Sequence, residues 1–564
     1  MKLFFEAFNI LPSFFKKRSI KFIILLLLAS FFETLGIGLV IPVIEFISDI
    51  DTPSKIFLHE YLTSIKIINS ENILFYVMFA FLLFYVLKNL FLIFFYYWNN
   101  KFCWNIYKEV SNNLLKTYIS RPITYYFSKN SSELINNTMN ECKFFSVIVQ
   151  SYLKLIAEFS ILISICTFLL FFEPLITLMF ILLIGVFYFL FIKITKNKIY
   201  NLGKKRHEIA SAQIKELQQN FESIKFIKLR SFEKKFIFPY SNLTKNFSQV
   251  SYLHGTLSEL PKISLEVLFI ASFVIMVFIF NSISSTQFDM IPILGLFAAA
   301  AFRILPSVNR IIDSRQQINF LKPCLEKIKN EFDFKASVNS VNNFNKPFDF
   351  KKDLKIQQLH YSYPNVNLPI INDISFSIEK NECVGIIGKS GSGKSTLADI
   401  IMGFMKPQQG KILVDNVDIF SNLKNWQNKI GYVPQSVYLL DDTIGKNIAL
   451  GLNSDEINEK KLIQTAKDAQ ILEFINSLKD GFNTLVGERG TKLSGGQIQR
   501  LGIARALYYS PELLIFDEAT SALDLDTEAE FLKSLEEFKG KKTIIIVSHR
   551  KSTLKDCNQI IELK

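Results

Sequence analysis

Long, mostly apolar segments dominate the chain before residue 315. Each of six such segments is close to the roughly 20 residues that a helix needs to cross about 30 Å of hydrocarbon. They cover residues 20–46, 73–97, 148–171, 175–195, 263–281 and 288–312. The pattern therefore predicts an α-helical membrane domain with six spans.

The polar segments between these spans divide by charge. Residues 99–147 and 196–262 are long and basic, whereas the connections 173–174 and 281–287 contain no Lys or Arg. Because basic loops tend to stay on the cytoplasmic side of a membrane, both termini and both long loops are predicted to be cytoplasmic. The long loops also have a helical pattern, so we expect the spanning helices to continue beyond the bilayer.

The connection between the first two spans, residues 49–72, has a pattern of its own. Apolar residues recur there on one face of a helix, which predicts an interfacial helix on the outer leaflet. The recurring residues are Phe57, Leu58, Tyr61, Leu62, Ile65 and Ile68. This helix either rests on lipid or touches substrate, and the first role is favoured.

The pattern changes after the last span. An irregular stretch rich in Asn, Lys and Phe comes first, and strands then alternate with helices, as in an α/β nucleotide-binding domain. The predicted organisation is a transmembrane domain at 1–320, a linker at 321–352 and an α/β P-loop ATPase domain at 353–564.

Composition and charge agree with a membrane protein. Of the 564 residues, 49% are hydrophobic, and a mean hydropathy of +0.24 is too high for an ordinary pair of soluble domains. The net charge of +13 would suit nucleic acid or anionic lipid. No nucleic-acid motif accompanies it, so the basic inner loops of a membrane protein explain it better.

Two classes of feature are not expected. The six cysteines show no C-x-x-C pairing, so neither a disulfide framework nor a zinc site is predicted. The basic run Lys16–Arg18 precedes an apolar segment much longer than a signal-peptide core. The segment is therefore interpreted as a retained span.

The first chemical motif is the stretch GKSGSGKST, which an apolar strand precedes and a helical run follows. Such a P-loop turns its backbone N–H groups around phosphate, which predicts a site for ATP and Mg²⁺. Lys394 is expected to reach the β- and γ-phosphates and Ser395 to ligate Mg²⁺. An accidental glycine-rich turn is the alternative, which the flanking elements disfavour. The motif comprises Gly388, Lys389, Ser390, Gly391, Ser392, Gly393, Lys394, Ser395 and Thr396.

Two carboxylates, Asp517 and Glu518, end an apolar strand that follows later in the chain. A buried parallel strand delivers the residues at its C-terminal end to the ligand crevice of such a sheet. Asp517 then suits the Mg²⁺ shell, and Glu518 suits polarising the water that attacks the γ-phosphate.

A second glycine-rich helix start, Leu493-Ser494-Gly495-Gly496-Gln497, lies between these motifs. Ser494 is placed as a helix cap, and the N-terminus of the helix predicts a second anion site. One nucleotide fills one P-loop, so a single chain has no evident use for two phosphate sites.

Together these motifs resemble the ATP-binding cassette (ABC) family, over the whole second domain. In that family the LSGGQ segment closes over the ATP held by the opposite subunit's P-loop, which implies a homodimer with two ATP molecules at its interface. The resemblance also assigns an adenine-stacking role to Tyr363, a metal-binding and catalytic role to Gln435, a D-loop ending in Asp524 and a catalytic role to His549.

The first domain extends the resemblance. Six spans fused ahead of the ATPase domain, and the loop Gly487–Gly490, resemble ABC exporters of the half-transporter kind. The segment Glu33–Gly38, with Pro42 and the outer segment after it, resembles the flippases of bacterial N-linked protein glycosylation. That resemblance implies a polyprenyl-pyrophosphate-linked oligosaccharide as substrate and the bacterial inner membrane as location.

Arg303 and Arg310 lie on a polar stripe of the sixth span, with Ser307, Ser314 and Gln317. An arginine at mid-bilayer depth costs roughly 2.5–3.5 kcal/mol on insertion scales and is a functional candidate by default. Because guanidinium groups bind phosphate oxygens bidentately, both arginines are predicted to follow the pyrophosphate of the substrate. In the alternative, Arg310 reaches the cytoplasmic face, and Arg303 pairs with an acid such as Glu33 or Glu158.

Three functions remain open at this point. The first is an ATP-driven flippase for lipid-linked oligosaccharide, and the second is an exporter of another lipid, such as lipid A, or of amphipathic drugs. The third is an ATP-gated regulator or channel without turnover. Glu518 and His549 argue against the third, because a gating protein can dispense with hydrolysis whereas a pump cannot.

Overall fold

The computed structural model describes residues 13–39, 73–172, 174–283, 290–338, 349–363, 368–519 and 536–563. The chain divides into two compact units. The helical unit consists of Met1–Arg121 with Lys129–Ser340, and the ATPase unit of Pro122–Ser128 with Val341–Lys564. The short segment Pro122–Ser128 thus groups with the second unit, although it lies inside the predicted first domain.

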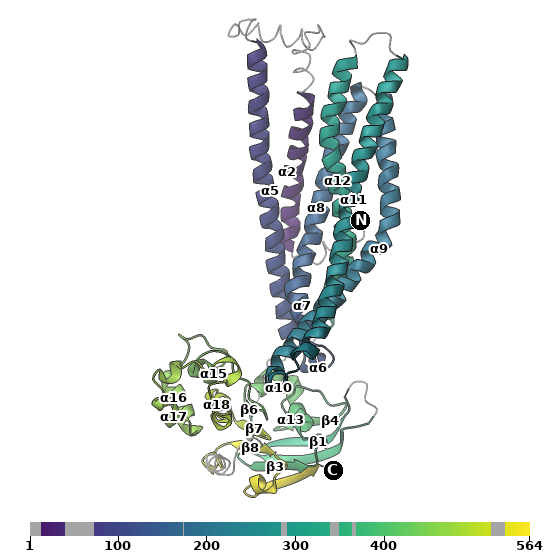
Figure 1. Ribbon diagram of the computed structural model, residues 1–564. Coiled ribbons are helices and arrows are strands. Elements are labelled where there is room, and N and C mark those ends of the chain that lie inside the picture. The colour runs from purple at the N-terminus through teal and green to yellow at the C-terminus, as the bar shows by residue number, and fades with distance from the viewer. Residues whose placement is uncertain are drawn as a thin grey trace. The chain divides into compact units, whose positions relative to one another are not determined.

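Six long helices form most of the described part of the helical unit, and Figure 1 shows them side by side as a bundle. They are α2 (Ser13–Gly38), α5 (Ile73–Ile119), α8 (Cys142–Phe172), α9 (Pro174–Glu222), α11 (Glu233–Ile283) and α12 (Met290–Val338). Shorter elements connect them: α7 (Ser131–Asn136), the π-helix η2 (Asn137–Glu141) and α10 (Ile224–Arg230). Helices α5 and α9 continue well past their apolar stretches, as the sequence predicted.

Three helices in the described residues are long and apolar enough to cross a membrane: Phe75–Ile119, Ser131–Phe171 and Thr177–Glu222. The other three predicted spans fall in α2, α11 and α12, each of which has side chains outside the described set. The predicted interfacial helix at 56–68, Pro42 and Glu173 also lie outside the described residues.

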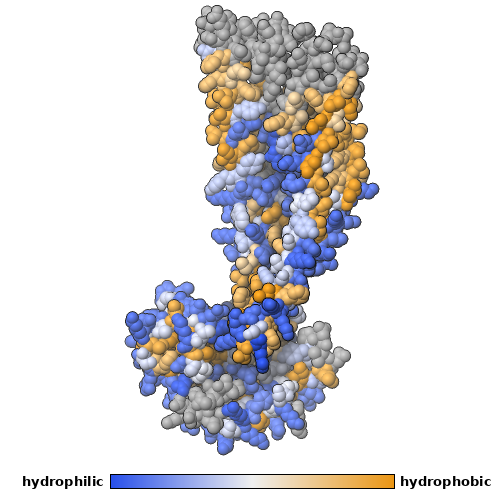
Figure 2. All heavy atoms as spheres, in the orientation of Figure 1, coloured by the Kyte–Doolittle hydropathy of each residue, from blue (hydrophilic) through white to orange (hydrophobic). Residues whose placement is uncertain are grey.

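Large apolar side chains cover the outside of the bundle, and Figure 2 shows them as orange areas along the helices. On α5, Phe75 is 68% exposed and Ile93 65%, and on α9, Leu182 is 69% and Phe189 65% exposed. Apolar surface on this scale is stable only in apolar surroundings, so it supports the predicted membrane location of the bundle.

The inside of the bundle is also apolar where α8, α11 and α12 meet. Ile165 of α8, Leu265 of α11 and Ile312 of α12 are fully buried in one cluster. Partly buried aromatic residues of α9, among them Phe180 and Phe187, pack against it.

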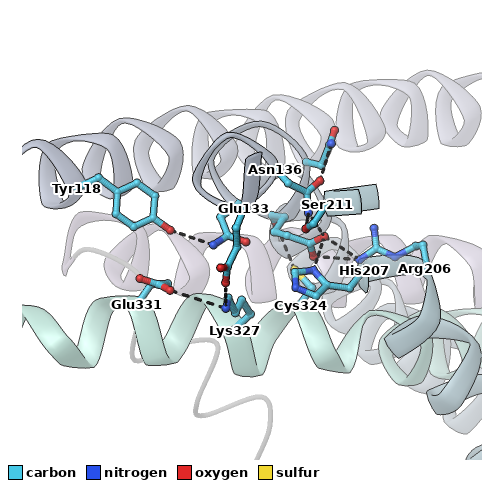
Figure 3. Close-up of polar contacts among 12 residues, drawn as sticks. Tyr118, Glu133, Asn136, Arg206, His207, Ser211, Cys324, Lys327 and Glu331 are labelled. Carbon is cyan, nitrogen blue, oxygen red and sulfur yellow. Dashed lines mark hydrogen bonds and ion pairs between the residues drawn. The ribbon is translucent and has the colours of Figure 1, made fainter. Parts of the chain in front are cut away.

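A buried polar network ties together the helices at the end of the bundle that holds α7 (Figure 3). Glu141, which is 0% exposed, pairs with Arg206 of α9 at 3.0 Å and lies 3.0 Å from the imidazole of His207. The thiol of Cys324, on α12, donates to the Glu141 backbone oxygen at 3.0 Å. The π-helical turn η2 therefore anchors α8 to both α9 and α12.

A second set of ion pairs flanks the segment Pro122–Ser128. Before it, Arg121 donates to the Glu331 carboxylate at 2.8 Å and to the Glu331 backbone oxygen at 2.6 Å. After it, Glu133 pairs with Lys327. Arg121 and Glu133, both in the helical unit, are thus attached to the same stretch of α12.

The ATPase unit contains two sheets. A parallel sheet has the order β6 (Ile430–Val433), β7 (Leu513–Asp517), β8 (Thr543–Val547), β3 (Cys383–Gly388) and β9 (Gln559–Leu563). An antiparallel sheet has the order β2 (Ile371–Glu379), β1 (Asp353–Tyr361), β4 (Gln409–Val414) and β5 (Val417–Asp418). Every residue of β7 and β8 is buried, as expected for central parallel strands.

Helices complete the ATPase unit: α6 (Ile123–Tyr126), α13 (Lys394–Ile401), α14 (Leu423–Gln427), α15 (Ile444–Ile448), α16 (Glu459–Asp468), α17 (Leu472–Ser477) and α18 (Gly495–Tyr508). Short 3-10 turns cover Ile419–Ser421, Gly481–Asn483, Glu488–Gly490 and Lys551–Leu554. One core joins the two sheets around α13 and the fully buried Trp426, and a second core packs α15 to α18 against the parallel sheet. The α/β class predicted for this domain is confirmed.

Candidate functional site

The parallel sheet brings the predicted catalytic motifs to one edge. In the order β6, β7, β8 and β3, the C-terminal ends of these strands lead to Gln435, Glu518, His549 and the P-loop. The register aligns these ends, because Asp517 is opposite Val547 and Val547 is opposite Ile386. Residues far apart in the sequence thus meet where parallel α/β sheets bind ligands.

The P-loop has the open backbone that phosphate binding requires. Gly391 and Gly393 have φ angles of 82° and 88°, a backbone conformation that residues other than glycine rarely adopt. A Cβ on Gly388 would lie 2.5 Å from the Ser392 hydroxyl oxygen and 2.7 Å from the Leu563 carbonyl oxygen, so glycine is needed there too. The buried Ser392 hydroxyl makes no hydrogen bond within the described residues, which leaves it available to a ligand.

Lys394 is folded back into the loop. Its ammonium group donates to the backbone oxygens of Gly388 at 3.1 Å and Lys389 at 3.0 Å. Burial lowers the pKa of Lys394, and the nearby carboxylates of Glu518 and Asp517 oppose that shift. The side chain therefore lies inside the cradle that would hold the nucleotide phosphates.

Ser395 and Asp517 are brought together as predicted for a Mg²⁺ site. The Ser395 hydroxyl donates to Asp517 Oδ1 at 3.1 Å. Burial raises the pKa of Asp517, and Glu518 adds to the shift, whereas a hydrogen bond from Ser395 lowers it. A hydroxyl and a carboxylate are hard oxygen ligands, so the pair fits Mg²⁺.

Glu518 is held from two sides. Gln435 Nε2 donates to Glu518 Oε2 at 2.8 Å, and His549 Nε2 lies 2.6 Å from Glu518 Oε1. The other ring nitrogen of His549 is 3.4 Å from the Lys394 ammonium group. Since that ammonium group can only donate, the network places the His549 proton on Nε2.

The structure thus places Gln435 against Glu518, whereas its predicted binding to Mg²⁺ stays a prediction. Glu518 itself has a φ of 48°, which is uncommon outside glycine, Asn and Asp. Such a backbone is often found at functional sites, because the surrounding structure holds it in place.

Tyr363 lies at the edge of the site. Its hydroxyl is 3.1 Å from the Thr396 hydroxyl, and its ring meets Phe127 edge to face, with centroids 5.7 Å apart. Phe127 and α6 belong to the ATPase unit, and Ile123 of α6 packs on the same core. Sequence reasoning missed Phe127, because no motif marks it within the basic segment 99–147.

Two further residues missed by sequence reasoning lie near Asp517. Tyr432 of β6 hydrogen-bonds to the Asp517 carboxylate. Asp399, one turn after Ser395 on α13, has a pKa of about 6, because burial and the charge of Asp517 both disfavour its ionised form. A tyrosine and an aspartate in an unaligned sequence give no signal that would single them out.

The LSGGQ segment starts α18 with a reciprocal cap. The Ser494 side chain accepts from the Gln497 backbone N–H at 3.3 Å, and the Gln497 side chain accepts from the Ser494 backbone N–H at 2.9 Å. The predicted cap is confirmed, and Gly495 and Gly496 form the first turn of the helix. The predicted D-loop, including Asp524, lies outside the described residues.

The two arginines of the sixth span are paired with acids, as the alternative for Arg303 foresaw. Arg303 binds Glu33 bidentately at 2.9 and 3.0 Å, and Lys88 reaches the same carboxylate at 3.3 Å. Arg310 Nη1 lies 3.0 Å from Glu158 Oε1. Sequence reasoning missed Lys88.

A cavity adjoins these pairs. Glu33, Lys154, Glu158 and Arg303 line it, together with apolar and aromatic residues of α5 and α8. Four basic side chains, Lys88, Lys154, Arg303 and Arg310, thus accompany two acidic ones, Glu33 and Glu158. Among the residues that line the cavity itself, two are basic and two are acidic, and the acidic Asp313 lies near Lys154.

Known proteins resemble both parts of the chain. Residues 371–521 match the family model "ABC transporter". An ATP-dependent lipid A-core flippase of Haemophilus influenzae is 42% identical over 212 residues, which are 37% of this chain and 36% of that protein. A toxin RTX-I translocation ATP-binding protein of Actinobacillus pleuropneumoniae is 41% identical over 217 residues, which are 38% of this chain and 30% of that protein. The chain thus matches only about a third of the length of these relatives.

The similarity in fold extends much further. A structure of a bacterial Atm1-family ABC exporter with ATP bound superposes with a TM-score of 0.78 and covers 98% of this chain and 94% of its own. Its sequence identity of 22% makes this a likeness of fold alone. The chain therefore has a segment that matches the ABC transporter family model, and its fold is that of an Atm1-family ABC exporter.

Proposed function

We propose that this chain is an ATP-driven flippase that moves polyprenyl-pyrophosphate-linked oligosaccharide from the inner to the outer leaflet of the bacterial cytoplasmic membrane. The proposed coupling to ATP hydrolysis rests on one observation. The P-loop, Asp517, Glu518 and His549 meet at one edge of the parallel sheet. Catalytic residues arranged in this way support a pump over a protein that only binds ATP.

Each residue at this edge has a proposed part in hydrolysis. The P-loop backbone and Lys394 bind the phosphates, while Ser395, Asp517 and Gln435 are proposed to hold Mg²⁺, which neutralises phosphate charge when bound. Glu518 orients the attacking water, and His549 keeps the Glu518 carboxylate in place through a 2.6 Å contact. Tyr363 stacks on the adenine, and its contact with Thr396 keeps it beside the P-loop.

The basic groups of the bundle interior support an anionic lipid substrate. Arg303 and Lys154 line the cavity, and Lys88 and Arg310 pair with the two carboxylates that line it. A pyrophosphate carries the charge and the oxygen geometry that guanidinium groups bind. In this proposal the phosphate oxygens replace the carboxylates of Glu33 and Glu158 as partners of the arginines.

A second candidate is the export of another anionic lipid. It is favoured by the sequence similarity to lipid A-core flippases. Such lipids also carry phosphate groups, so the same basic residues would suit them.

Purified protein in vesicles that contain labelled lipid-linked oligosaccharide should expose the label on the far leaflet only when ATP and Mg²⁺ are present. Accessibility to an added glycosidase measures this transfer. Vesicles with labelled lipid A provide the comparison: preferential transfer of lipid A would favour the second candidate, and transfer of neither lipid would contradict both.

The working unit is proposed to be a homodimer with two ATP molecules at its interface. The apolar surface of α10 supports a partner, because Phe226 is 52% and Leu229 78% exposed on a helix outside the predicted spans. Full-rate ATP hydrolysis by a strictly monomeric form would contradict the homodimer.

Co-expression of two defective chains tests the composite site. One chain carries Lys394→Ala, and the other carries Gly495→Asp. The new aspartate would place a negative charge beside the ATP phosphates bound by the partner chain. It should not disturb the fold, because a Cβ at Gly495 meets nothing within 4 Å. Each variant alone should be inactive, whereas mixed dimers hold one intact site and should recover measurable ATPase activity. The readout is phosphate release by dimers purified through a different tag on each chain.

A further inference from the structure

Two thiol groups of the ATPase unit lie in contact. Cys383 is the first residue of β3, and Cys557 lies two residues before β9. Their sulfur atoms are 3.4 Å apart. Cys383 is only 2% exposed, whereas Cys557 is half-buried and can be reached by a small solute.

The backbone holds these two residues in place. The Cys383 N–H donates to the Asn558 side-chain oxygen at 2.9 Å, and the Asn558 N–H donates to the Cys383 carbonyl oxygen at 2.8 Å. Parallel pairing of β3 with β9 begins at the next residues, Val384 and Gln559. The sulfurs therefore need to approach by only about 1.4 Å, through side-chain rotation, to reach the disulfide bond length of about 2.05 Å.

The contact between the two thiols favours the thiolate on Cys383 and the thiol on Cys557. It lowers the pKa of Cys383, although burial opposes that shift, and together with burial it raises the pKa of Cys557. Lys539 lowers the pKa of Cys383 further, whereas Asp556 and Glu382 oppose this shift. Because the thiolate is the nucleophile in thiol chemistry, Cys557 needs a group that takes its proton, and the Cys383 sulfur at 3.4 Å can accept it.

We propose that Cys383 and Cys557 form a reversible oxidation site that a peroxide converts into a disulfide. The Cys557 sulfur attacks one oxygen of hydrogen peroxide as its proton passes to the Cys383 sulfur. The O–O bond breaks, the leaving hydroxide takes a proton from solvent, and the products are a sulfenic acid and water. The Cys383 sulfur then attacks the sulfenic sulfur, the S–O bond breaks, and the oxygen leaves as a second water with the remaining thiol proton. Two thiols are oxidised and one peroxide is reduced to two waters.

The disulfide would stabilise the ATPase unit without closing its site. It links residues 174 positions apart. Closing a loop of that length lowers the conformational entropy of the unfolded chain, which stabilises the folded state. Cys383 lies at the end of β3 opposite Gly388, so the P-loop backbone need not move. For a unit of this size the thermal midpoint should rise by about 5–10 °C.

The test uses the full-length protein in detergent, treated with hydrogen peroxide, alkylated and digested. Mass spectrometry should find a peptide that links Cys383 to Cys557 and disappears after reduction with dithiothreitol. The thermal midpoint of the ATPase unit should rise on oxidation and fall on reduction.

Two variants separate this site from general oxidation. Cys557→Ser should abolish both the linked peptide and the rise of the midpoint, whereas Cys166→Ser, which removes a half-buried thiol of the helical unit, should leave both unchanged. The linked peptide in the unaltered chain is decisive even if Cys557→Ser misfolds. Alkylation of both thiols after peroxide treatment, a sulfinic acid on Cys557 without the link, or a rise that persists in Cys557→Ser would overturn the proposal.

Discussion

Replacing Glu518 with Gln should lower the rate of ATP hydrolysis by a factor on the order of 10² or more. The amide keeps the shape of the side chain but loses the charge that orients water. It also disturbs a contact, because Gln435 and His549 both donate to the Glu518 carboxylate and an amide presents only one oxygen. Phosphate release under saturating Mg²⁺-ATP measures the rate.

ATP binding should survive this substitution, since the P-loop is unchanged. Equilibrium binding of a fluorescent ATP analogue should give a similar affinity for Glu518→Gln, whereas Lys394→Ala should lose nucleotide binding or turnover. Glu512→Gln is a matched control: it alters a glutamate just before the other end of β7, where the carboxylate pairs with Lys429 and Lys380. Near-normal turnover of Glu518→Gln would refute the role given to this residue.

Replacing both Arg303 and Arg310 with Ala should abolish flipping of the lipid-linked substrate and leave basal ATPase activity largely intact. The nucleotide site contains neither residue, whereas the proposed phosphate path loses both guanidinium groups. Transfer in vesicles and phosphate release in the same preparation measure the two activities. Flipping at the unaltered rate would refute the phosphate role.

The ion pairs of these arginines require further variants, because the double substitution leaves Glu33 and Glu158 with fewer partners. Glu33→Gln with Glu158→Gln removes the acids and keeps both arginines, so flipping should persist if the arginines bind phosphate. The fourfold variant without the acids and the arginines should fold but not flip, and Lys88→Met is added to it because Glu33 is also the partner of Lys88. Equal loss of ATPase activity and folding in both acid and arginine variants would instead assign the pairs a structural role.

The ATPase unit could be predicted because each of its motifs indicates both a local structure and a place in the sheet. A P-loop requires a strand before it and a helix after it, and β3 and α13 follow that order. Asp517 is the last residue of β7, and His549 follows β8. The apolar residues of both strands indicate central positions in a sheet. The meeting of Asp517 and His549 at one edge follows from parallel strand order, which apolar runs indicate.

Contacts between distant helices could not be predicted in the same way. Glu33 was named as a possible partner of Arg303, whereas Lys88 was missed, although a lysine within an apolar span is a functional candidate on the same grounds as Arg303. Phe127 lies beside Tyr363 through tertiary packing. Periodicity shows which face of a helix is apolar, but it does not show which residue of another helix lies opposite.

The network around Glu141 has a consequence for how the bundle can rearrange. Sliding α9 along α8 by one turn, about 5.4 Å, would separate Glu141 from Arg206 and leave a fully buried charge without its partner. Breaking such a pair costs about 3–5 kcal/mol. The network therefore fixes the register between these helices, so we expect the ends of α8, α9 and α12 to rotate or translate as one rigid body if the bundle rearranges.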